Sequence, residues 1–109
     1  MKAIIDGCRY DTEKSIEIGS FDNIGRGASS MNDFHYWEAS LYKTPRSAKY
    51  FLAGEGGPMT QFARAVSQNS WGGGSKILPM TEKEAFEWAQ QYLESEIIEE
   101  HFGHMIQDA

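Results

Sequence analysis

The sequence predicts an α+β domain: a small antiparallel sheet, with a short helix and a longer C-terminal amphipathic helix packed on one face. Three observations support this class. Asp6-Gly7 is a two-residue hairpin turn between short apolar runs, because both positions accept positive φ. Phe34–Tyr42 is rich in aromatic residues and fits a strand, and Thr81 with Glu84 has the spacing of a helix capping box. The 109 residues are enough for one domain, 1–109, without a second core.

The N-terminal third is expected to hold short strands and one long loop. Lys2–Ile5 and Cys8–Tyr10 are the arms of the first hairpin, and the alternation of Ile16–Ile18 favours another strand. Gly19–Asp33 is rich in glycine, serine, asparagine and aspartate, which is typical of a loop.

A second hairpin is predicted in the middle of the chain. Phe34–Tyr42 and Lys49–Ala53 are its strands, and Thr44–Ser47 is its turn, with Pro45 pre-set for the first central position. Gly54–Pro58 ends the second strand.

Three elements separate this hairpin from the last helix. Met59–Val66 carries apolar residues on one side at spacings of three and four, which predicts a short helix. Ser70–Ser75 reads as a glycine-rich loop around Trp71, and Lys76–Leu78 as a last short strand.

The C-terminal helix has the clearest signals. Thr81 is the predicted N-cap, and Glu84 completes the capping box. Apolar residues then form one stripe at helical spacing: Ala85, Phe86, Ala89, Leu93 and Ile97. Gly103 is expected to end a further turn at Glu99–Phe102.

Negative charge is concentrated in this segment. The chain has 16 acids and 10 bases, for a net charge of −6, and residues 81–109 hold eight acids and a single base, Lys83. The acidic helical segment spans 81–103. Such a segment repels nucleic acid and attracts basic surfaces, so binding of nucleic acid through bulk positive charge is excluded. A solvated helix face that keeps the protein in solution is the alternative interpretation.

The composition also indicates the cellular compartment in which the protein is expected. Cys8 is the single cysteine, so no intrachain disulfide can form. No apolar run approaches the roughly 20 residues that cross a bilayer, and no signal-peptide apolar region follows Met1. We therefore expect a cytoplasmic protein with no membrane partner.

No catalytic constellation is recognised, and neither a metal nor a cofactor is predicted. Cys8 lies beside the cationic Arg9, as reactive thiols do, but the sequence does not place a base such as His35 near it. His101 and His104 have the spacing that puts two imidazoles on one helix face, whereas zinc needs three or four ligands. Two solvent-exposed histidines are the alternative interpretation.

Two glycine-rich segments are candidate ligand loops. One leads into the predicted short helix, whose N-terminus would suit a phosphate, and the other surrounds Trp71. Neither fits the dinucleotide or phosphate-loop motif, and tight structural turns also explain both. The candidates for a small-molecule or nucleotide site are Gly54, Glu55, Gly56, Gly57, Trp71, Gly73 and Gly74.

Several short motifs, spread over most of the chain, carry a family resemblance. They are Tyr10–Glu13, Ile18–Ser20, Leu41–Thr44, Tyr50–Met59, Ser70–Gly74 and Glu84–Ala89. With them the chain resembles small acidic proteins of bacterial plasmids, prophages and other mobile elements. It is similar to some anti-CRISPR proteins of that group.

The resemblance implies a non-enzymatic inhibitor in the cytoplasm of a bacterial host, which binds a host defence protein such as a CRISPR effector and no nucleic acid directly. Such effectors hold nucleic acid in positively charged channels, which an acidic protein can occupy as a DNA mimic. An inhibitor could equally bind elsewhere and block a conformational step. The candidate contact residues are Glu87, Glu94, Glu96, Glu99, Glu100, Tyr36, Trp37 and Tyr42. Core packing is the simpler interpretation of the three aromatic residues.

Overall fold

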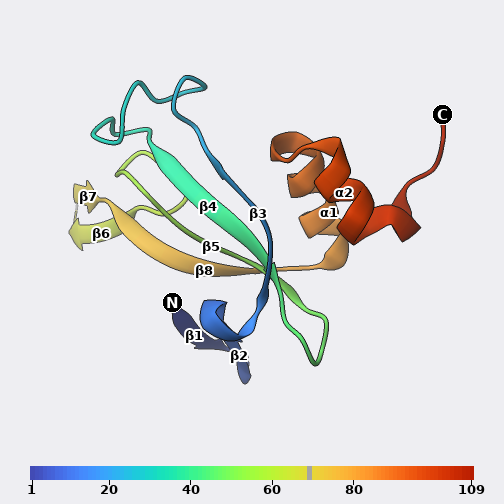
Figure 1. Cartoon of the computed structure of the whole chain (residues 1–109). Coiled ribbons are helices and arrows are strands. Elements are labelled where there is room, and N and C mark those ends of the chain that lie inside the picture. The colour runs from blue at the N-terminus through green and yellow to red at the C-terminus, as the bar shows by residue number, and fades with distance from the viewer. Residues whose placement is uncertain (69) are drawn as a thin grey trace.

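The computed structural model describes residues 1–68 and 70–109 and has an α+β fold of antiparallel strands and two helices (Figure 1). The strands are β1 (Lys2–Ile5), β2 (Cys8–Asp11), β3 (Ile16–Asp22), β4 (Trp37–Lys43), β5 (Tyr50–Gly56), β6 (Arg64–Ser67), β7 (Ser70–Gly72) and β8 (Gly74–Met80). The helices are α1 (Glu82–Tyr92) and α2 (Ser95–Phe102), with short 3₁₀ turns η1 (Thr12–Lys14) and η2 (Gly103–Met105). Neither helix within the described residues has the length and apolar character needed to cross a membrane.

The central sheet is antiparallel, in the order β3-β4-β5-β8. Leu41 of β4, Leu52 of β5 and Leu78 of β8 lie in register across it. Along the chain, strands β6 and β7 come between β5 and β8 and form their own two-stranded sheet. Strands β1 and β2 form a separate hairpin. Asp6 and Gly7 have φ of 51° and 78°, so the predicted two-residue turn between β1 and β2 is confirmed.

Each face of the central sheet has its own apolar cluster. On one face, Leu41, Tyr50 and Leu52 pack with Ala89 of α1 and Phe102 of α2. On the other face, Phe51 of β5 and Ile77 of β8 form a smaller buried cluster with Tyr10 of the β1–β2 hairpin. The helices and the hairpin therefore cover different faces of one sheet (Figure 1).

The prediction of a short helix at Met59–Val66 is wrong. The chain turns after Gly57 and enters strand β6 at Arg64. Phe62 is fully buried, but Met59 and Val66 are 64% and 56% exposed, so the apolar spacing did not mark one packed face. The ring of Phe62 instead fills the space above Gly54 that a side chain on residue 54 would otherwise occupy.

The prediction of a loop at Ser70–Ser75 is also wrong, because most of these residues belong to strands β7 and β8. The earlier loop lies later in the chain than predicted: β3 continues to Asp22, and Phe34–Tyr36, predicted as strand, lie outside β4. Asn23, which is buried, fastens this loop, since its side chain donates to His35 O and accepts from Trp37 N, both at 2.8 Å.

The C-terminal helical segment is two helices, whereas the apolar stripe predicted continuity through Ile97. The capping box is confirmed: Glu84 N donates to Thr81 Oγ1 at 3.1 Å, and Thr81 N donates to Glu84 Oε1 at 2.8 Å. Leu93 and Glu94 then adopt extended ψ values of 161° and 154°, which ends α1 and starts α2 in a new direction. Helix α2 ends at Phe102, next to Gly103 as predicted.

Candidate functional site

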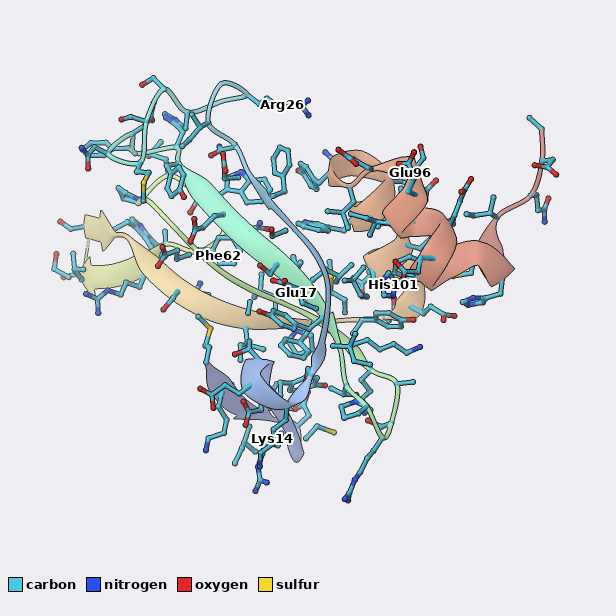
Figure 2. The ribbon with its side chains drawn as sticks, in the orientation of Figure 1. Lys14, Glu17, Arg26, Phe62, Glu96 and His101 are labelled. Atoms are coloured by element: carbon cyan, nitrogen blue, oxygen red, sulfur yellow. The ribbon has the colours of Figure 1, made fainter. Side chains whose placement is uncertain are left out.

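The acidic candidates gather on one part of the molecule, which we call the helical lobe (α1, α2 and the segment up to Ala109). Its predicted contact carboxylates are all exposed: Glu87, Glu94, Glu96, Glu99 and Glu100. Figure 2 shows Glu96 at the upper edge of the helical lobe. The lobe therefore presents these carboxylates to solvent at one end of the molecule.

These carboxylates have almost no cationic partners. Every ion pair within 4.0 Å in the described part of the chain involves a histidine: Asp33–His35, Glu100–His101 and Glu82–His104. Within residues 1–68 and 70–109, then, no lysine or arginine neutralises a carboxylate at contact distance. Uncompensated charges of one sign project a field into solvent that favours a basic partner.

The three predicted aromatic contacts lie largely inside the fold. Tyr36 is 6% exposed, and its hydroxyl donates to Glu38 Oε2, which together with burial raises the Tyr36 pKa to about 12. Trp37 packs against Phe21 and Tyr92, and the ring of Tyr42 stacks on another core ring. The aromatic side chains that are exposed are Phe34 and Trp71, at 66% and 62%. The sequence places Phe34 in the predicted strand Phe34–Tyr42 and Trp71 in a candidate ligand loop, so neither is a predicted contact residue of a protein partner.

The two glycine-rich segments meet, as the ligand-loop interpretation requires. Gly56 of β5 pairs with Gly74 of β8, and together with Gly57 and Gly73 they line an open pocket of about 620 Å³. Tyr36, Glu55, Arg64 and Ser75 contribute its polar side chains. Gly54 and Trp71, the remaining candidates, lie outside the lining. We call this the glycine pocket.

Backbone packing accounts for these glycines. A Cβ on Gly54 would lie 2.5 Å from Glu38 O and 2.6 Å from the Phe62 ring, and one on Gly57 would lie 2.5 Å from Phe34 O. Because no helix follows Gly57, the helix N-terminus expected to hold a phosphate is absent. The tight-turn interpretation therefore explains these residues better than a phosphate loop does.

A row of carboxylates, not recognised in the sequence, shares Glu55 with the glycine pocket and lines a second open pocket of about 490 Å³. Asp22, Glu38 and Glu55 lie directly opposite one another on β3, β4 and β5. The neighbouring Glu38 carboxyl raises the pKa of Glu55 through a shared hydrogen bond and like charge. Only the strand register reveals this row, since the three residues are far apart in sequence. Among the described residues, Arg64 makes no ion pair with this row, and its Nε donates to Gly73 O at 3.1 Å.

The thiol and the histidines lie in separate places. Cys8 is half-buried on β2, and Lys49 Nζ lies 3.4 Å from its Sγ. His35 is in the loop before β4, and His104 Nε2 contacts Glu82 Oε2 at 3.1 Å. Within residues 1–68 and 70–109, no group of three or more His, Cys, Asp or Glu side chains is placed to hold a metal ion.

Comparison with known proteins adds no relative. No protein-family model matches the chain, and neither a curated protein nor a solved structure matches it significantly. Proposals about function therefore depend on the geometry of the helical lobe and the glycine pocket, together with the resemblance in the motifs.

Proposed function

We propose that this chain is a non-enzymatic inhibitor that uses its helical lobe to occupy a basic, nucleic-acid-binding channel of a bacterial defence nuclease. The observation that carries the proposal is the set of exposed carboxylates on α1 and α2, none of which contacts a lysine or arginine within the described residues. A CRISPR effector in the host cytoplasm is the target class that the motif resemblance names.

The mechanism is competition for cationic side chains. Effector channels hold nucleic acid largely through lysine and arginine contacts to its backbone. An exposed cluster of carboxylates offers the same side chains an alternative partner, and the long-range field speeds the encounter. Since the field acts through solvent, the interaction is expected to weaken steeply as salt is raised.

Paired charge reversals test the proposal. In the first variant, Glu96→Lys is combined with Glu99→Lys, which changes the charge of the helical lobe by four units. The matched control combines Glu13→Lys with Glu17→Lys, which makes the same change in net charge at exposed positions outside the lobe. DNA cleavage by a panel of purified CRISPR effectors is measured with each protein, at low and high salt.

We expect the wild type and the control to inhibit one effector at low salt, and the lobe variant to lose inhibition. Equal inhibition by both variants would reject the charge-mimic mechanism. Inhibition of no effector in the panel would count against the target class.

The glycine pocket favours a second candidate function, which is binding of a small molecule or nucleotide. The observation that supports this function is that both glycine-rich segments line one pocket with Tyr36, Glu55 and Arg64. Its volume of about 620 Å³ lies within the usual range of ligand sites, about 300–1,000 Å³. A ligand that binds the native state must raise the melting temperature, so a nucleotide and metabolite panel tests this function. An Arg64→Ala variant should lose any shift that the pocket causes.

A further inference from the structure

We propose that a groove in the helical lobe anchors a basic segment of a partner protein, in which an apolar side chain lies beside lysine or arginine. The inference deepens the proposed function and takes from it the expectation of a basic partner. The groove has a volume of about 440 Å³. Three successive pieces of chain line it, namely α1, α2 and the segment after α2: Phe86, Gln90, Ser95, Ile98, Met105 and Ile106.

The break between the two helices makes the groove. Because Leu93 and Glu94 are extended, α2 does not continue along α1, and the two helices diverge. The chain then makes a last 3₁₀ turn, in which Ile106 N donates to Gly103 O at 3.2 Å. This turn places Met105 and Ile106 beside the helices as the third wall.

The floor of the groove is apolar and continuous with the core. Phe86, Ile98 and Met105 are half-buried and pack against the main cluster. Ile106 lies outside that cluster and is 40% exposed. A single exposed apolar residue is ordinary on a protein surface, but several gathered in one concave site form a surface that can bind a partner.

The lining of the groove holds one carboxylate, Glu99, and no basic side chain, and this determines the chemistry of the occupant. Glu99 lines the groove, and Glu87 and Glu94 are the sequence neighbours of the lining residues Phe86 and Ser95. None of the three contacts a lysine or arginine among the described residues. An acidic occupant would be repelled, and a purely apolar one would desolvate carboxylates without pairing them. In a basic segment with an apolar anchor, the apolar side chain packs on the floor and the lysine or arginine pairs with the carboxylates. Such anchors supply most of the binding energy of an interface.

Peptide probes test the groove directly. The full chain is titrated against a short fluorescent peptide of alternating leucine and lysine pairs, and fluorescence anisotropy gives the dissociation constant. Two further peptides replace leucine by glutamine, or lysine by glutamate. We expect the leucine–lysine peptide to bind most tightly and the glutamate peptide not to bind.

Matched variants locate the site. Ile106→Ser removes an apolar wall and should weaken binding of the leucine–lysine peptide about tenfold. Ile4→Ser, which changes a residue 69% exposed on β1, should leave binding unchanged. Glu99→Lys should weaken binding more than Glu96→Lys, because Glu96 does not line the groove. Thermal melts of all four variants confirm that each one folds.

The outcomes separate this inference from the proposed function. Equal affinity for the lysine peptides with leucine and with glutamine, with no effect of Ile106→Ser, would overturn the groove, although effector inhibition by the acidic lobe could still be observed. Groove-dependent peptide binding without inhibition of any effector in the panel would support the anchor site and count against CRISPR effectors as the target class. Self-association that Ile106→Ser abolishes in sedimentation would assign the groove to a second copy, and so overturn the basic occupant.

Discussion

One face of the central sheet is covered in two different ways at its two ends. At the end near the helices, β4 and β5 present Leu41 and Leu52, which pack with Phe102 of α2; their exposures are 0%, 2% and 0%. At the other end, the same strands present Ala39 and Gly54, and the ring of Phe62, labelled in Figure 2, fills the space above Gly54. The first end is packed by side-chain volume, and the second by close approach of the backbone.

This difference changes what each end tolerates. A side-chain-filled end loses stability when volume is removed, because a cavity remains. A glycine-filled end loses stability when volume is added, because backbone atoms cannot move aside cheaply. The following predictions test the contrast, from the largest expected effect to the smallest.

Phe102→Ala should have the largest effect. The ring is fully buried and lies 5.5 Å from the ring centroids of both Tyr50 and Phe86, so it joins α2 to the sheet and to α1. Its removal is expected to lower the free energy of unfolding by about 3–5 kcal/mol, measured by urea denaturation. Phe34→Ala is the control, since Phe34 is 66% exposed and its loss should change stability by less than about 0.5 kcal/mol. Similar losses in both variants would show that α2 is not packed as described.

Gly54→Ala tests the opposite end by adding a methyl group. The new Cβ would lie 2.5 Å from Glu38 O, a backbone atom, and 2.6 Å from the Phe62 ring. We expect a loss of about 1–3 kcal/mol in the free energy of unfolding. Gly103→Ala makes the same chemical change where nothing lies within 4 Å and φ is −53°, so it should stabilise the protein by about 0.4–1 kcal/mol. A neutral Gly54→Ala would contradict the close approach at this end.

The same contrast explains which elements the sequence predicted. Thr81 and Glu84 predict the start of α1 correctly, because capping depends on neighbours a few residues away, whereas the apolar stripe runs past the end of α1 at Tyr92. Phe62 was assigned to a helix because its spacing to other apolar residues is helical, whereas its position depends on Gly54, which only the tertiary fold brings under it. The row of Asp22, Glu38 and Glu55 was missed for a similar reason, since register is a property of paired strands. Local signals therefore located the helical lobe, and the pockets and the groove required the structure.

Thr81→Ala should have an intermediate effect, confined to the helix end. It removes the hydroxyl that accepts from Glu84 N, and loss of such a cap is expected to lower the free energy of unfolding by about 1 kcal/mol. Thr81→Ser retains the hydroxyl and should restore most of the stability. The backbone N–H of Thr81 lowers the pKa of Glu84 below 4.5, so this part of the cap is present at neutral pH and is lost as the pH falls through the lowered value. A Thr81→Ala variant as stable as the wild type in urea at pH 7 would show that the cap contributes nothing.

Glu55→Gln should have the smallest effect and the opposite sign. Glu55 lies directly opposite Glu38, and the hydrogen bond between the two carboxyls, together with their like charge, raises the pKa of Glu55 above its ordinary 4.5. A raised pKa means that the folded state binds the proton more tightly than the unfolded state, so the stability it contributes is present below the ordinary value and is lost as the pH rises through the raised one. At pH 7 the carboxylate is therefore unfavourable, and glutamine should stabilise the protein by about 0.2–1 kcal/mol. The gain should disappear below about pH 4, where the carboxyl is already neutral. Glu13→Gln, on the exposed η1 turn, removes the same charge without an opposing carboxylate in register and should show no such pH dependence. A gain that is equal for both variants, or that persists in acid, would show that net charge rather than this cross-strand pair causes the effect.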